Sequence, residues 1–346
     1  MADALEQTVV ATRQGRIGHL LLNRPKALNA LDIGMIRGLA DPLNAWRDDP
    51  AIHAVVIEGT GGRAFCAGGD IRAARAAAVS GRHDEVATFF TEEYALNQAI
   101  ADYPKPYVAL IDGICMGGGI GVSVHGSARV VTDTALFAMP ETGIALFPDI
   151  GASYILPRLR GSIGMYMALT GARLHGPDAV FAGLATHYVP REALAGLANA
   201  LATDGPAVLA GSAATPPPAP IAENMKVVNR CFDAPSVAVV IERLTAEPSQ
   251  FARDALQAIR AASPSAVLWT FELVRAGLGR TLPQCLAAEL ALTAYVTRHP
   301  DFAEGVRAMV IDKDRAPKWS PATLDAVDPA SIAAMFCQRQ GEKAAG

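Results

Sequence analysis

Strand and helix patterns alternate along the first part of the chain, and this alternation most limits how the chain can fold. The runs 52–61, 105–113 and 127–139 are rich in β-branched and apolar residues, which is typical of buried strands. Between the runs, 33–49 and 84–103 carry apolar residues at helical spacing. Strands separated by helices pair in parallel through crossover connections. The sequence therefore predicts an α/β protein with a parallel sheet.

The length of the chain indicates more than one compact region. At 346 residues it exceeds the size at which a single core usually keeps growing. Pro, Gly, Ala and Ser concentrate in 206–220, which indicates a linker or surface loop, and helical patterns such as 282–299 follow. We therefore predict a core over 1–205, a linker over 206–220 and a mainly helical region over 221–346.

Composition and charge exclude several classes of protein. The formal net charge is −4 and no block of basic residues occurs, so a nucleic acid is not an expected partner. The five cysteines are scattered, and neither they nor the histidines show the spacing of a metal site or a disulfide framework. The first residues lack a signal or transit pattern, so the cytoplasm is the expected location.

One segment, 107–126, is long and apolar enough to imitate a membrane span. Asp112 and the run of three glycines at 117–119 favour a buried strand, a turn and a packed helix instead. We therefore expect no membrane association.

Two glycine-rich turns, 59–74 and 112–126, follow buried strands and lead into helical patterns. Such turns let backbone N–H groups converge where a helix begins, and two converging donors form an oxyanion hole. The same glycines also permit a strand and a helix to pack tightly. Spacing alone leaves both interpretations open.

Two known motifs are incomplete near these turns, and one cysteine lacks a catalytic partner in the sequence. Val122 stands where a dinucleotide-binding G-x-G-x-x-G would have its last glycine. His125 stands where a G-x-S-x-G nucleophile elbow would end, so we interpret Ser123 as a core hydroxyl. Cys66 has no histidine nearby in the sequence and is interpreted as a small buried residue.

The stretch 139–151, MPETGIALFPDIG, places Glu141 and Asp149 among apolar residues. Acidic side chains are almost never fully buried unless they are paired or hydrogen-bonded. Both acids therefore need a structural or a chemical role.

Several stretches resemble successive signatures of the crotonase superfamily, also called the enoyl-CoA hydratase/isomerase superfamily. They are NRPKALNAL (23–31), AFCAGGDIR (64–72), 105–126 and 139–151. The tail 305–327 resembles a hydrolase subgroup rather than generic hydratases. The resemblance implies an α/β, crotonase-like (ClpP/crotonase) ββα spiral core followed by a mainly helical C-terminal region.

The resemblance also implies roles for particular residues. The amides of Ala67 and Gly118 would form the oxyanion hole around a CoA thioester carbonyl, and Glu141 and Asp149 would form an acidic pair. Glu93 matches a polar position that contacts substrate, with an exposed helical charge as the alternative. The other positions implied in substrate binding are Arg24, Lys26, Ala27, Gly68, Gly69, Asp70 and Gly117.

Departures from the hydratase pattern point to a different reaction. The first hydratase glutamate would fall at Gly121, and Asp149 stands where hydratases typically have glycine. The resemblance therefore implies hydrolysis of a short branched 3-hydroxyacyl-CoA thioester, preferably 3-hydroxyisobutyryl-CoA from valine catabolism. Glu141 would act as nucleophile or general base, and Asp149 would orient the 3-hydroxyl or water and assist proton transfer to the departing thiolate.

Alternatives to this hydrolase remain open. One is an enoyl-CoA hydratase or isomerase on the same fold, and another is a non-catalytic acyl-CoA-binding or scaffold protein. No metal or redox cofactor is expected, because the two amides would polarise the carbonyl, and CoA enters as part of the substrate. Trimers and pairs of trimers are common in the superfamily, so the resemblance also implies a homo-oligomer.

Overall fold

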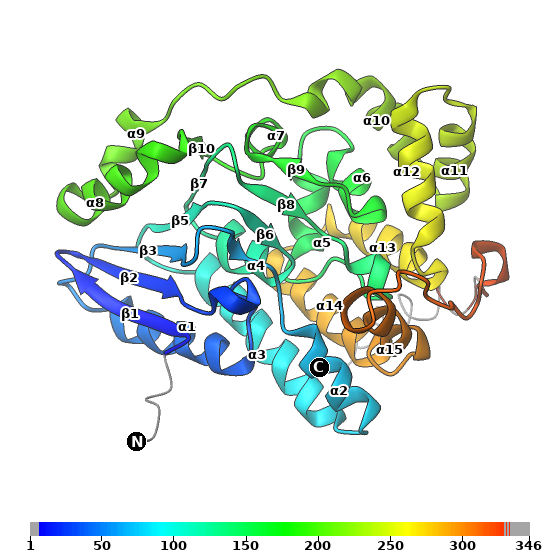
Figure 1. Ribbon diagram of the computed structural model, residues 1–346, viewed down its shortest axis with the longest axis horizontal. Coiled ribbons are helices and arrows are strands. Elements are labelled where there is room, and N and C mark those ends of the chain that lie inside the picture. The colour runs from blue at the N-terminus through cyan, green and yellow to red at the C-terminus, as the bar shows by residue number, and fades with distance from the viewer. Residues whose placement is uncertain (1–6, 329, 331, 333–346) are drawn as a thin grey trace. The chain divides into compact units, whose positions relative to one another are not determined.

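The computed structural model describes residues 7–328, 330 and 332 (Figure 1). The chain forms two compact units, and each unit is built from three separate segments. Unit 1 draws on Met1–Asp70, Phe89–Ala138 and Arg173–Glu223, and unit 2 on Ile71–Thr88, Met139–Ala172 and Asn224–Gly346.

The larger sheet of unit 1 has six strands in the order β1-β2-β3-β5-β7-β10. The first two strands form the antiparallel edge, and all later neighbours pair in parallel, as alternation with helices predicts (Figure 1). The strands are β1 Val9–Gln14, β2 Ile17–Leu22, β3 Ala54–Gly59, β5 Tyr107–Ile111, β7 Ala128–Val131 and β10 His187–Tyr188.

The smaller sheet of unit 1 carries the two glycine-rich turns. Its strands, in order, are β4 Ala64–Cys66, β6 Ile114–Met116, β8 Leu136–Ala138 and β9 Leu174–His175. The first three pair in parallel, and β9 is antiparallel to β8. Residues 66–70 and 116–118 therefore leave neighbouring parallel strands at the same end of this sheet.

The structure differs from the sequence prediction over 127–139, which holds two strands instead of one. β7 belongs to the larger sheet and β8 to the smaller sheet. The chain turns between them because the hydroxyls of Thr132 and Thr134 both donate to the carboxylate of Asp112. A continuous apolar run in the sequence does not reveal this turn.

Helices cover the larger sheet and complete unit 1. Leu197 and Leu201 of α8 pack in one core cluster with Val108 and Val130 of the sheet. The α-helices here are α1 Ile33–Arg47, α4 Gly118–Val124, α7 Gly176–Ala182, α8 Leu194–Asp204 and α9 Leu209–Ser212. The 3-10 helices are η1 Pro25–Ala27, η4 Arg191–Ala193, η5 Pro206–Val208 and η6 Pro220–Asn224. Helix α3, His83–Ala101, begins in unit 2 and continues in unit 1.

The predicted linker, 206–220, begins with η5 and α9, whereas 213–219 has neither helix nor strand. Leu209 is buried in the core cluster of unit 1, so the first half of this segment packs as part of that unit. The separation of a 1–205 core from a 221–346 region stays a prediction.

Unit 2 is helical apart from irregular connections, which agrees with the predicted helical C-terminal region. Val267 and Phe271 of α13 pack with Val240 of α11 and Ile259 of α12. The α-helices are α2 Ile71–Val79, α5 Ala152–Ile155, α6 Ile163–Thr170, α10 Met225–Phe232, α11 Val237–Ala246, α12 Gln250–Ala261, α13 Pro264–Gly277, α14 Leu282–Val296 and α15 Pro300–Val306. Shorter turns are η2 Glu141–Ile144, η3 Leu156–Arg158, the π-helix η7 Arg307–Ile311 and η8 Leu324–Ala326.

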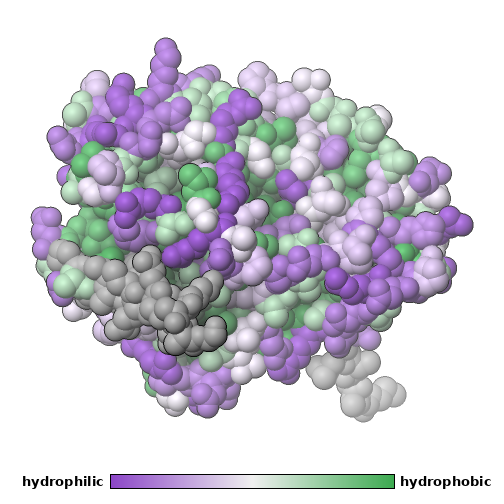
Figure 2. All heavy atoms as spheres, turned by 180° about the vertical axis from the view of Figure 1, so that it is seen from behind, coloured by the Kyte–Doolittle hydropathy of each residue, from purple (hydrophilic) through white to green (hydrophobic). Residues whose placement is uncertain are grey.

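Among the described residues, no helix is both long enough and apolar enough to cross a membrane. The segment 107–126 instead forms a buried strand, β5, a turn and a packed helix, α4, as predicted, and a second strand, β6, which was not predicted, lies between the turn and the helix. Hydrophilic side chains are spread over the face shown in Figure 2. Four cysteines are free and buried, and the fifth, Cys337, lies outside the described residues.

Candidate active site

Two backbone N–H groups lie together in unit 1, where the chain leaves β4 and β6. A Cβ atom built on Gly118 would lie 3.2 Å from the amide nitrogen of Gly69. Within the described part of the chain, neither of these two N–H groups donates to another protein group. Gly68 (φ +110°) and Gly117 (φ +45°) provide the left-handed backbone that such an approach requires. The two glycine-rich turns therefore present a pair of donors, as an oxyanion hole requires.

The structure corrects one member of the predicted pair. The N–H of Ala67 donates to the carbonyl of Leu28 at 3.0 Å, so it is already occupied. Gly69, predicted only as a substrate-binding residue, supplies the second donor beside Gly118. The correction shifts the donor by two positions and leaves the predicted chemistry unchanged.

Glu93 lies beside this amide pair and does not face water. Glu93 is 2% exposed, because it lies on a buried face of α3. A Cβ atom on Gly118 would meet its Oε1, and one on Gly69 would lie 3.9 Å from the same oxygen. The alternative of an exposed helical charge is therefore wrong. The same carboxylate and, more strongly, burial raise the pKa of the Cys66 thiol to about 12.

A network of polar contacts joins the segment 23–31 to the first glycine-rich turn. Arg24 donates to the carboxylate of Asp70 at 3.0 Å and to the carbonyl of Ala30 at 3.0 Å. Asn29 is fully buried, and its amide donates to the carbonyls of Thr60 and Ala64. The structure thus brings the predicted binding residues Arg24 and Asp70 together, with the exposed Lys26 and half-buried Ala27 on the intervening turn η1. Their contact with substrate stays a prediction.

Glu141 and Asp149 lie in unit 2, and both are buried. Glu141, 6% exposed, is the first residue of η2. The next residue, Thr142, accepts a hydrogen bond from the N–H of Ser263 at 3.1 Å, which fastens this turn to the start of α13. Asp149 is 5% exposed and precedes α5. Burial of both acids fits residues that serve chemistry rather than solubility.

Sequence reasoning missed Glu289, a fully buried carboxylate on α14. It accepts hydrogen bonds from the N–H of Gly151 at 2.7 Å and the N–H of Ser153 at 2.9 Å. The pKa of Glu289 is raised to about 8, chiefly by burial and also by the charge of Asp149, against the lowering effect of its hydrogen bonds. The available signal was an acid within the apolar run CLAAELAL, which was interpreted only as part of the helical pattern over 282–299.

The other chemical candidates are structural. The hydroxyl of Ser123 donates to the carbonyls of Gly119 and Ile120 in its own helix, which confirms a core hydroxyl. Cys66 is fully buried, which confirms a small buried residue. Among the described residues, no group of three His, Cys, Asp or Glu side chains could hold a metal ion.

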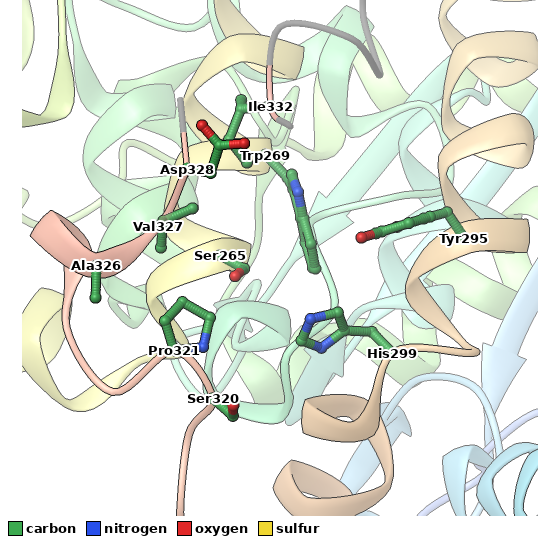
Figure 3. Close-up of a pocket in the computed structure, with 10 residues that line it drawn as sticks. All are labelled: Ser265, Trp269, Tyr295, His299, Ser320, Pro321, Ala326, Val327, Asp328 and Ile332. Atoms are coloured by element: carbon green, nitrogen blue, oxygen red, sulfur yellow. The ribbon is translucent and has the colours of Figure 1, made fainter. Parts of the chain in front are cut away.

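A separate hollow in unit 2 has a volume of about 270 Å³ and is lined by none of the predicted site residues. Figure 3 shows Trp269, Tyr295 and His299 turned toward one another on its wall. The centroid of the Trp269 ring lies 5.9 Å from that of Tyr295 and 5.6 Å from that of His299, with edge-to-face geometry. These rings form an aromatic cluster that packs α13 against α14 and the start of α15.

Comparison with known proteins identifies the family. A model of the enoyl-CoA hydratase/isomerase family matches residues 17–336. Mitochondrial 3-hydroxyisobutyryl-CoA hydrolase from Xenopus tropicalis is 46% identical over 338 residues, which cover 94% of this chain and 87% of that protein. The human protein of the same name is 45% identical over 337 residues, with the same coverage. The chain therefore belongs to the enoyl-CoA hydratase/isomerase, or crotonase, family.

Solved structures confirm the predicted fold. A carnitinyl-CoA dehydratase from Mycobacterium thermoresistibile is 41% identical, with a TM-score of 0.91 over 95% of this chain and 96% of that one. An enoyl-CoA hydratase from Rhodobacter sphaeroides is 37% identical, with a TM-score of 0.91 over 95% of this chain and 97% of that one. The α/β crotonase fold with a helical C-terminal region is thus established.

Proposed function

We propose that this chain hydrolyses 3-hydroxyisobutyryl-CoA to 3-hydroxyisobutyrate and CoA. The observation that carries the proposal is the 46% identity, over 94% of the chain, with a hydrolase of that name. Two departures from the hydratase pattern support the same reaction. Gly121 stands where hydratases have their first glutamate, and Asp149 stands where they typically have glycine.

The amides of Gly69 and Gly118 polarise the thioester carbonyl. Negative charge develops on the carbonyl oxygen as the carbon becomes tetrahedral, and each preorganised N–H donor contributes about 3 kcal/mol to that state. Because the donors belong to the backbone, they need no deprotonation and no reorganisation. Glu93 lies next to both amides, where it can contact the acyl group, as the family resemblance implies.

Glu141 provides the nucleophile or the general base, and Asp149 assists the proton transfer. In one route Glu141 attacks the carbonyl carbon, CoA leaves as a thiol after gaining a proton, and water cleaves the resulting mixed anhydride. In the other route Glu141 removes a proton from water, which attacks directly. Asp149 orients the 3-hydroxyl or water and assists the proton transfer to the leaving sulfur. A label in the Glu141 carboxylate after turnover in ¹⁸O-labelled water would show the anhydride route with water attacking the Glu141 carbonyl carbon, since the general-base route labels only the product.

The function is tested with two substrates and one variant. The protein should release free thiol from 3-hydroxyisobutyryl-CoA and leave the enoyl absorbance of crotonyl-CoA unchanged. Loss of enoyl absorbance without thiol would indicate a hydratase, and CoA-ester binding without either reaction would indicate a scaffold. Glu141→Gln should lower kcat by about three orders of magnitude with the fold intact by circular dichroism. Near-normal turnover of this variant would refute the role of Glu141.

We further propose a cytoplasmic protein that assembles as a trimer or hexamer, because its first residues show no signal or transit pattern and such assemblies are common in the superfamily. Mass photometry of the purified protein tests the assembly, and a single peak at the monomer mass, 36.1 kDa, would contradict it. Fractionation of the source cells tests the location.

A further inference from the structure

Glu289 is a buried carboxylate that the proposed mechanism does not use. It lies in the middle of α14 with 0% exposure. Its Oε2 accepts from the N–H of Gly151 at 2.7 Å, and its Oε1 accepts from the N–H of Ser153 at 2.9 Å and the Ser153 hydroxyl at 2.5 Å. All three donors therefore belong to residues two and four positions after Asp149.

The backbone between Asp149 and these donors is strained. Ile150 has φ +59° and Gly151 has φ +82°, so two successive residues adopt the left-handed conformation. For a β-branched side chain this conformation is a genuine outlier, and it persists only where surrounding contacts enforce it. The N–H of Ala152 also donates to the carbonyl of Asp149 at 2.9 Å, so the turn closes on Asp149 itself.

We infer that Glu289 is a positioning residue for Asp149, an inference that rests on the proposed function. By accepting from Gly151 and Ser153, Glu289 enforces the left-handed turn at Ile150. This left-handed turn then fixes the direction in which the carboxylate of Asp149 points. The first N–H groups of a helix have no partner within that helix. At the start of α5, Glu289 accepts hydrogen bonds from two of them.

The electrostatic coupling between the two acids supports this role. Asp149 raises the pKa of Glu289, and by the same interaction an ionised Glu289 disfavours ionisation of Asp149. The ionisable groups that interact with Glu289 are Asp149, from the segment before α5, and Cys285, one turn earlier on α14. Because burial raises the pKa of Cys285 above its ordinary value of 9.0, this thiol stays neutral where Glu289 titrates.

The variant Glu289→Gln tests the inference. Glutamine keeps the size of the side chain and one acceptor, but it turns an NH₂ group toward one of the two N–H donors. We expect kcat for 3-hydroxyisobutyryl-CoA to fall about 10-fold or more, and KM to change by less than about 3-fold, because Asp149 acts in the chemical step. Ser153→Ala removes one donor of three and should give an intermediate loss of kcat.

A matched control is available in unit 1. Asp178 is also a buried acid, and its carboxylate accepts from two backbone N–H groups, those of His175 at 3.2 Å and Ile221 at 2.9 Å. Asp178→Asn therefore repeats the chemical change in unit 1, whereas Asp149 belongs to unit 2, and kcat should stay within about 2-fold of the wild type. Equal loss of kcat in both variants would overturn the inference, since it would reflect general destabilisation.

The pH dependence of kcat distinguishes positioning from a merely structural role. The wild type and Asp178→Asn should show a change in kcat with an apparent pKa near 8, where Glu289 ionises beside Asp149. Glu289→Gln should lack this change. A loss of kcat that is uniform across pH, with the change near 8 retained, would contradict the inference.

Failure of the proposed function would be visible separately. If the wild type releases no thiol from the thioester, the hydrolase proposal fails, and hydrogen exchange of the peptide 149–155 decides the inference. Faster exchange of this peptide in Glu289→Gln, with no change in Asp178→Asn, supports a turn held by Glu289. Equal exchange in all three proteins overturns it.

Discussion

Stability should depend on pH through Glu289, and Glu289→Gln should remove that dependence. The pKa of this carboxyl is about 8 in the folded chain, against an ordinary value of 4.5. Between these two values the native state holds a proton that the unfolded state has lost, so stability falls as pH rises through the window. The largest slope is about 1.4 kcal/mol for each pH unit. Between about pH 5.5 and about pH 7.5 the loss accumulates to about 3 kcal/mol.

Urea unfolding followed by circular dichroism measures this effect. The free energy of unfolding of the wild type should fall relative to that of Glu289→Gln by about 3 kcal/mol across this pH range, with similar urea dependence. Ser153→Ala keeps the titrating carboxyl and should keep the slope of the wild type. Parallel pH profiles for the wild type and Glu289→Gln would refute the raised pKa and the reasoning built on it.

Two further predictions concern unit 1. Gly118→Ala should lower kcat about 100-fold, since a new methyl group would press against Glu93 and lie 3.2 Å from the nitrogen of Gly69. Gly196→Ala, which adds a methyl group with nothing within 4 Å, is the matched control, and an equal loss in both would contradict the assignment. Cys66, buried and with a pKa of about 12, should resist alkylation near pH 8 in the native protein and react in urea, and peptide mass mapping checks this. Labelling of Cys66 in the native protein would show that it is accessible.

Regular elements were predictable from the sequence because periodicity reports burial directly. Helix α3 spans His83–Ala101 where 84–103 was predicted, and β5 spans Tyr107–Ile111 within 105–113. The split between β7 and β8 was not predictable, because it depends on hydroxyl contacts to Asp112 from a residue twenty positions away. The role of Glu289 was hidden for a similar reason, since its partners Gly151 and Ser153 lie more than a hundred positions earlier.

The proposed oxyanion donor, the N–H of Gly69, could not be identified from the sequence. Ala67, Gly68 and Gly69 all fit a glycine-rich turn, and a motif does not state which N–H is available. The segment 28–31 pairs with the turn and occupies two of its N–H groups, and the N–H of Gly69 is the one that lies beside Gly118. Leu28 accepts from the N–H of Ala67, and Leu31 accepts from the N–H of Asp70 at 2.7 Å. In extended backbone, neighbouring N–H groups point to opposite sides, so the N–H of Gly69 is directed away from Leu31 when that of Asp70 points toward it. The available donor is thus set by a neighbouring segment rather than by the residue type at the site.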